Sequence, residues 1–172
     1  LASGFPDPAA AALAFALGGY RFDRYRSAKP RGVVLAAPAG VDMAEVERVA
    51  AGCFLARDLV NTPANDLGPE ELAAAAADLA AAYGARCEVI VGEALIERNF
   101  PLVHAVGAAS ARAPRLIDIV WGDESHPKVT LVGKGVCFDT GGLNIKPDSG
   151  MALMKKDMGG AANVLGLARM VM

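Results

Sequence analysis

Two patterns of apolar residues alternate along this chain. In the first, apolar positions recur at helical spacing, which predicts a long helix capped by Asp42 and broken at residues 61–63, and a second helix from Pro69 to Tyr83. The same spacing predicts helices at residues 8–17, 93–98, 102–109 and 158–172. In the second, short continuous apolar runs predict strands at residues 33–37, 87–91, 116–121 and 129–132. Strands separated by helices predict an α/β fold with a mainly parallel or mixed sheet flanked by helices.

The composition is that of a globular domain with no general affinity for polyanions. The 172 residues are 53% hydrophobic, enough for one domain with a substantial core. A net charge of −2 and a pI near 5.7 give no general attraction to nucleic acid or anionic membranes. No apolar run in the sequence reaches the roughly 18 residues that span a bilayer. The cysteines are widely spaced and form no C-x-x-C motif, which favours a reducing compartment over a disulfide scaffold.

The candidate chemistry follows the apolar run at residues 129–132. Lys134, Asp139, Lys146 and Asp157 lie on glycine-rich sequence after this predicted buried strand, and α/β folds bind ligands at the carboxyl ends of strands. Carboxylate oxygens suit divalent cations, and a lysine can join them as its neutral amine. Lys134, Asp139 and Asp157 are therefore candidates to converge on one metal ion. Lys146 could stay protonated and stabilise a developing oxyanion, so the set predicts metal-assisted hydrolysis.

Other interpretations of these residues remain open. Lys134 and Asp139 could form a buried ion pair without a catalytic role. Residues 133–135 could belong to a phosphate-binding loop, although the Walker pattern is absent and the later glycine pair does not open a helix directly. Cys137 is expected to be a small core residue. A basic, tyrosine-containing stretch at residues 20–31 could contact nucleic acid, but an acidic residue interrupts it and a solvated connector is the better interpretation.

Several strings in the sequence resemble one known family. VGKGVCFDTGG, NIKP and MKKDMGGAA resemble the signature region of the leucyl aminopeptidases, the cytosol aminopeptidase family of two-metal exopeptidases. Upstream, ARDLVNTPAND resembles the start of that family's catalytic domain, and VHAVGAASARAPRLI resembles its next helix and strand. The one local departure is at residues 99–101, where many members are glycine-rich. The resemblance extends over most of the chain from Tyr20 onward.

The resemblance implies a role for each candidate residue. Lys134 is similar to the lysine that binds one metal, and Asp139 to the aspartate that bridges both metals. Asp157 is similar to the aspartate that binds the first metal and lies near the α-amino group of the substrate. Lys146 is similar to the catalytic lysine that assists the scissile carbonyl. Met154 falls where the family has a methionine lining the pocket for the N-terminal side chain, although it could instead only pack in the core.

The resemblance also implies an activity and its partners. The expected reaction is hydrolysis of N-terminal residues, leucine and similar, from peptides, with two divalent ions (Mn²⁺ or Zn²⁺) and a bicarbonate base in the complete enzyme. A cytoplasmic homo-hexamer is expected, with no membrane or nucleic-acid partner. The alternative is a non-catalytic binding or assembly role, because some proteins that resemble this family bind DNA.

The predicted domain organisation is incomplete. Residues 1–40 are expected to be the end of an N-terminal domain and its connector, and residues 41–172 the first part of the metallopeptidase catalytic domain. The family's Asn-Thr-Asp-Ala-Glu-Gly-Arg motif, which supplies further metal carboxylates and a catalytic arginine, does not occur in this sequence. The chain is therefore expected to be a fragment of a longer enzyme and to be inactive alone.

Overall fold

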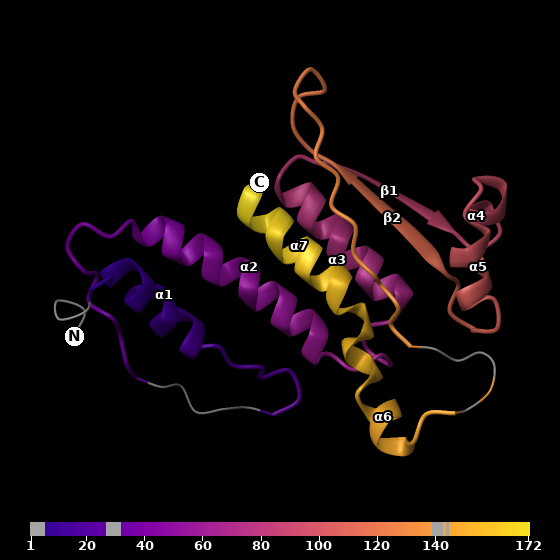
Figure 1. Ribbon diagram of the computed structural model, residues 1–172, viewed down its shortest axis with the longest axis horizontal. Coiled ribbons are helices and arrows are strands. Elements are labelled where there is room, and N and C mark those ends of the chain that lie inside the picture. Colours follow the sequence, from indigo (N-terminus) through magenta and orange to yellow (C-terminus); the bar gives the residue numbers. More distant parts are fainter. Residues whose placement is uncertain (1–5, 27–31, 139–142, 144) are drawn as a thin grey trace.

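The computed structural model describes residues 6–26, 32–138, 143 and 145–172. Helices pack against one another and against one face of a small sheet, while two short helices lie at one end of that sheet (Figure 1). The elements in chain order are α1 (Pro8–Gly18), α2 (Met43–Asn61), α3 (Pro69–Ala82), β1 (Arg86–Val91), α4 (Ala94–Glu97), α5 (Pro101–Gly107), β2 (Arg115–Val120), α6 (Asp148–Ala152), the 3₁₀-helix η2 (Met154–Met158) and α7 (Gly159–Val171).

Local signals in the sequence set the ends of the two long helices. The Asp42 carboxylate accepts hydrogen bonds from the backbone N–H groups of Ala44 and Glu45, so it caps the start of α2. At the other end, the hydroxyl of buried Thr62 donates to the carbonyl of Asp58 at 2.7 Å. These contacts confirm the predicted start and break of this helix. The helix predicted from Pro69 is also confirmed, as α3.

The two strands pair in an antiparallel orientation. Arg86 lies opposite Val120, and Val91 lies opposite Arg115. The α/β class is confirmed, but a parallel orientation is wrong for this pair. The reason lies in the connection: residues 92–114, all of them described, contain the short helices α4 and α5 and no helix that crosses the face of the sheet, as the connection of a parallel pair usually does. These two helices stay at one end of the sheet, and the chain turns back (Figure 1).

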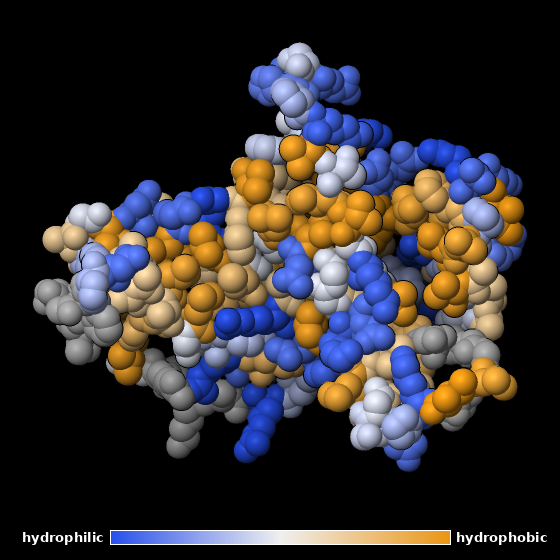
Figure 2. Space-filling model, viewed as in Figure 1, coloured by the Kyte–Doolittle hydropathy of each residue, from blue (hydrophilic) through white to orange (hydrophobic). Residues whose placement is uncertain are grey.

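The strands predicted at residues 33–37 and 129–132 are wrong for this structure. The described residues in both segments have no regular secondary structure. Val129 and Val132 are 81% and 89% exposed. A strand needs a neighbour that accepts and donates its backbone hydrogen bonds, and within the described part of the chain β1 and β2 pair only with each other. Leu167 and Val171 of α7 are also exposed. Figure 2 shows a broad apolar area on one face of the molecule.

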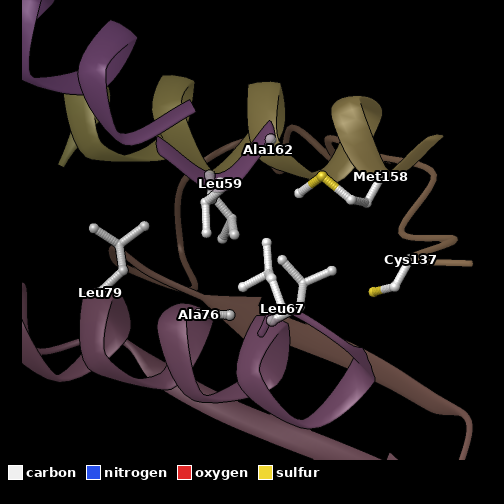
Figure 3. Packing of buried hydrophobic residues seen from close by; sticks show 9 residues of the cluster. Leu59, Leu67, Ala76, Leu79, Cys137, Met158 and Ala162 are labelled. Carbon is white, nitrogen blue, oxygen red and sulfur yellow. The ribbon is translucent and has the colours of Figure 1, made fainter. Parts of the chain in front are cut away.

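The hydrophobic core lies between α2, α7 and α3, and α3 separates α7 from the sheet (Figures 1 and 3). Burial of each leucine here contributes about 1.5–3 kcal/mol. One end of the cluster contains Cys137 and Met158, which immediately adjoin the predicted metal-binding sequence. The buried members are Leu59, Leu67, Leu72, Ala76, Leu79, Cys137, Met158, Ala162 and Leu165.

Paired glycines let α2 and α7 cross at close range. A Cβ atom on Gly52 would lie 2.6 Å from the carbonyl oxygen of Gly166, and one on Gly166 would lie 2.7 Å from the carbonyl oxygen of Gly52. Real Cβ contacts do not approach this closely, so a side chain at either position would force the helices apart. The two glycines thereby fix the position of α7 against α2, and with it the loop that leads into α7.

The segment before α2 docks on this helix. The Tyr20 hydroxyl donates to the Asp58 carboxylate at 2.8 Å and accepts from the Asn61 amide at 3.0 Å. The Tyr25 hydroxyl donates to Asp66. Residues 20–26 have no regular secondary structure, and their two tyrosines attach them to the end of α2 and to the loop that follows it.

Candidate metal centre

Backbone contact between two glycine-containing segments places Lys134 at the start of α7. The N–H of Ala161 donates to the carbonyl oxygen of Lys134 at 2.9 Å. A Cβ atom on Gly133 would lie 2.6 Å from the Gly160 carbonyl oxygen, and one on Gly160 would lie 2.7 Å from the Lys134 nitrogen. Glycine is required at both positions for the backbones to touch. The sequence Gly133-Lys134 is thus held against the helix that follows Asp157.

Asp157 lies at the centre of a group of lysines. Its side chain is 16% exposed, and it lies in η2, immediately before α7. The ammonium of Lys156 donates to Oδ1 at 2.9 Å. The ammonium nitrogens of Lys134 and Lys146 lie 3.7 and 4.0 Å from Oδ2. The structure therefore brings together three of the predicted site residues, which lie as far as 23 positions apart in the sequence.

These lysines keep Asp157 ionised. The hydrogen bond from Lys156 is the main cause that holds the pKa of the Asp157 carboxyl below its usual range, and the charges of Lys156, Lys134 and Lys146 act in the same direction. Partial burial opposes them. Both oxygens of the carboxylate therefore contact cationic groups, which a divalent ion at this carboxylate would have to displace or bind as neutral amines.

The remaining predicted ligand is outside the described residues. Asp139 falls in the gap at residues 139–142, so its convergence with Lys134 and Asp157 stays a prediction. Within the described ranges, no three His, Cys, Asp and Glu side chains group closely enough to hold a metal ion. The ligand roles of Lys134 and Asp157 rest on their mutual proximity and on the resemblance.

Two neighbours of Asp157 in η2 have different environments. Met154 is only 2% exposed, and its contact with a substrate side chain stays a prediction. Lys155 is half-buried, and its ammonium donates to the carbonyl oxygen of Asn61 at 3.0 Å. A lysine at this position satisfies a terminal carbonyl of α2 and complements the helix dipole. Lys155 therefore anchors η2 to the end of α2, a contact that sequence reasoning missed because the two residues are 94 positions apart.

An arginine that sequence reasoning also missed ties the loop before β2 to the loop between α2 and α3 and to the start of α3. Arg112 forms an ion pair with Glu71 of α3 and donates to the carbonyl oxygen of Ala64 at 2.9 Å. Glu71 in turn accepts from the backbone N–H of Gly68 at 2.9 Å. A Cβ atom on Gly68 would overlap the guanidinium of Arg112, so glycine makes room for this pair. No sequence motif pointed to it, because its partners, the Glu71 carboxylate and the Ala64 carbonyl oxygen, are 41 and 48 positions away.

Cys137 is a buried core residue, as predicted. Burial raises the pKa of its thiol to about 11, with the charge of Arg112 lowering it slightly and that of Glu71 raising it. The thiol hydrogen points toward the Gly135 carbonyl, with 3.5 Å between sulfur and oxygen. The neutral thiol is therefore the form present in the folded protein at neutral pH.

We expect Cys137 to be the slowest of the three thiols to react with Ellman's reagent at pH 8. The thiolate is the nucleophile, and a pKa of about 11 leaves about one thiol in a thousand ionised. Thiol titration of the native protein and of the Cys137→Ala variant measures this, and rapid modification of native Cys137 would contradict it.

The raised pKa of Cys137 also makes stability depend on pH. In the unfolded chain the Cys137 thiol loses its proton at a lower pH than in the folded protein, near pH 8.5–9. The contribution of Cys137 to the free energy of unfolding should therefore fall as pH rises from about 8.5 to about 11, and the variant should lack this fall.

The fold and the charged site define a class. It is an α/β domain in which glycine-containing segments hold lysines around an ionised aspartate, and it lacks the Walker pattern of a phosphate-binding loop. The sequence model of the cytosol aminopeptidase family, catalytic domain, matches residues 54–172. The chain belongs to the cytosol aminopeptidase family.

Individual relatives agree with this assignment. The probable cytosol aminopeptidase of Nitrobacter winogradskyi is 43% identical over 165 residues, which cover 88% of this chain and 33% of the relative. The crystal structure of cytosol aminopeptidase from Coxiella burnetii matches with a TM-score of 0.92 at 50% identity, over 100% of this chain and 38% of that one. The bottromycin maturation enzyme BotP in complex with Mn matches with a TM-score of 0.81 at 38% identity, over 99% of this chain and 39% of that one.

The match extends over only part of each relative. The chain spans about a third of the length of the curated relatives it matches. Among the described residues, none of the helices is long and apolar enough to cross a membrane.

Proposed function

We propose that the protein containing this chain is a metal-dependent aminopeptidase that removes N-terminal residues, leucine and similar, from peptides. The observation that carries the proposal is the approach of Lys134 and Lys146 to the Asp157 carboxylate, at 3.7 and 4.0 Å, within a sequence of the cytosol aminopeptidase family. Relatives named as cytosol aminopeptidases support it. They give no support to the alternative of a DNA-binding assembly protein.

Two divalent ions would complete the centre. Lys134, Asp139 and Asp157 would hold them together with carboxylates from the part of the relatives that this chain does not span. The fit rests on the donor chemistry of Asp157, an ionised carboxylate that is mostly buried, and of Lys134, whose amine lies 3.7 Å from its Oδ2. The Mn bound to BotP supports Mn²⁺ as one of the candidate ions, beside Zn²⁺. When bound, the ions would polarise the scissile carbonyl and activate water.

The remaining proposed roles belong to side chains of this chain. Lys146 is half exposed and lies at the same carboxylate as Lys134, so its ammonium can face a substrate carbonyl and stabilise the oxyanion that develops there. Asp157 would also bind the substrate's α-amino group, and Met154 would contribute to the side-chain pocket. A bicarbonate base, a homo-hexameric assembly and a cytoplasmic location are further parts of the proposal. The proposal also divides the chain into residues 1–40, the end of an N-terminal domain and its connector, and residues 41–172, the first part of the catalytic domain.

The test compares the isolated 172-residue chain with the protein extended to the full length of its relatives. We expect the extended protein to hydrolyse leucine p-nitroanilide, to lose activity when chelation and dialysis remove metal, and to regain it with Mn²⁺ or Zn²⁺. The isolated chain should be inactive, because Asp139 and Asp157 supply two negative charges to ions that carry about four positive ones. Exposed Val129 and Val132 also favour its aggregation.

Two results would count against the proposal. An extended protein that folds, binds metal and still shows no release of N-terminal residues would refute the aminopeptidase activity. Equal turnover by the isolated chain would show that other residues carry the reaction.

A further inference from the structure

We infer that Lys156 lowers the affinity of this centre for divalent metal by competing with the ion for the Asp157 carboxylate. The inference rests on the proposed metal site and assigns a role to a residue outside the predicted catalytic and ligand set. Lys156 makes the shortest contact to Asp157 of any cationic group in the described residues, 2.9 Å from Nζ to Oδ1.

The two carboxylate oxygens have different partners. Lys134 and Lys146 both approach Oδ2, whereas Lys156 holds Oδ1. Lys134 is itself a candidate ligand, so its amine could remain beside a bound ion. Lys156 is not a candidate ligand. An ion bound to this carboxylate would lie close to its ammonium, and the two positive charges would repel, so the ion must displace the ammonium or bind less tightly.

Exposure makes this competition reversible. The side chain of Lys156 is 63% exposed, and that of Asp157 is 16% exposed. A long, flexible lysine can turn its ammonium into water at little cost, and exposed ion pairs contribute little free energy. Lys156 should therefore weaken metal binding without preventing it, and its charge should continue to repel a nearby divalent ion after it has turned away.

The neighbouring lysine supplies a matched control. Lys155 has the same charge and lies in the same 3₁₀-helix, but its ammonium binds the carbonyl oxygen of Asn61 and forms no ion pair with Asp157 within 4.0 Å. Lys155→Gln removes an equal charge from η2 and keeps an N–H donor for the Asn61 carbonyl oxygen, so the Lys156–Asp157 contact is expected to stay in place. A general effect of charge would appear in both variants, whereas competition for Oδ1 would appear only when Lys156 is changed.

The experiment measures Mn²⁺ binding to the metal-free, full-length protein by titration calorimetry and by the electron paramagnetic resonance signal of free Mn²⁺. Wild type, Lys156→Gln, Lys156→Arg and Lys155→Gln are compared at low and high salt. We expect Lys156→Gln to bind Mn²⁺ about three- to fivefold more tightly than wild type, on the scale of an exposed ion pair. Lys156→Arg, which keeps the charge, should stay close to wild type, and Lys155→Gln should bind no more tightly. The gain in Lys156→Gln should shrink at high salt, because salt screens exposed charges.

The outcomes separate this inference from the proposed function. Equal Mn²⁺ affinity in wild type and Lys156→Gln would overturn the competition and leave the metal site intact. An equal gain in Lys155→Gln would also overturn it, in favour of a general charge effect. If folded wild-type protein binds no Mn²⁺ or Zn²⁺, the proposed metal site fails and the role of Lys156 fails with it.

Discussion

Replacing Lys146 with alanine in the full-length protein is expected to lower kcat for leucine p-nitroanilide by about 10²-fold or more, the scale of losing one oxyanion stabiliser. Metal content should be nearly unchanged, because the ammonium of Lys146 lies 4.0 Å from Asp157 and is proposed to act on the substrate rather than on the ion. Steady-state kinetics together with metal analysis by mass spectrometry would measure both quantities.

The Lys146→Arg variant is the control for charge. It keeps a cation near the substrate carbonyl and should retain more of kcat than alanine does, although the guanidinium differs in shape and hydration. Proportional loss of metal and activity in Lys146→Ala would instead identify Lys146 as a metal ligand, and unchanged kcat would remove it from the reaction.

Replacing Gly160 with alanine should weaken metal binding, although Gly160 contacts no side-chain atom that is proposed to bind the metal. Its new Cβ would lie 2.7 Å from the backbone nitrogen of Lys134, so Lys134 must move away from the start of α7. The hydrogen bond from Ala161 to the Lys134 carbonyl oxygen would lengthen or break. We expect the free energy of unfolding to fall by about 1–3 kcal/mol, as in other overpacked sites, and Mn²⁺ affinity to fall with it. Denaturant unfolding of the metal-free protein and Mn²⁺ titration would check the two effects.

Gly18→Ala is the matched substitution for this test. A Cβ atom there meets nothing within 4 Å, and the residue lies at the exposed end of α1. Alanine in a helix is intrinsically more stable than glycine, so this variant should be neutral or slightly stabilising and should bind metal normally. If Gly160→Ala also left the free energy of unfolding and the Mn²⁺ affinity unchanged, the close packing of Gly160 against Lys134 would not determine the position of the site.

Helix positions were predictable because their signals are local. Asp42 caps α2 through backbone groups two and three residues away, and Pro69 opens α3 at the position where a missing N–H costs nothing. The strands at β1 and β2 were also found, within one residue at their ends, from short apolar runs. None of these signals contains information about which element lies beside which, so the antiparallel orientation of the sheet could not be read from them.

The segment at residues 129–132 shows the opposite case. Its apolar run has the composition of a buried strand, but the structure leaves Val129 and Val132 largely exposed. Strand formation depends on a partner that supplies hydrogen bonds and covers the side chains, and no described residue does this here. A sequence pattern can indicate a preference for a strand, but it cannot supply the neighbour on which the strand depends.

For the candidate site, the sequence alone determined the family, the types of residue and the spacing of Lys134, Lys146 and Asp157, because the motif is contiguous and chemically specific. Only the tertiary structure decided how they meet. The close contact of Gly133 with Gly160 places Lys134 at Asp157, and the crossing of α2 and α7 brings the Asn61 carbonyl to Lys155. The sequence assigned no role to Lys156, yet among the described cationic groups it makes the shortest contact to Asp157. Proximity between ammonium and carboxylate groups depends on how backbones pack in three dimensions, and spacing along the chain does not encode that directly.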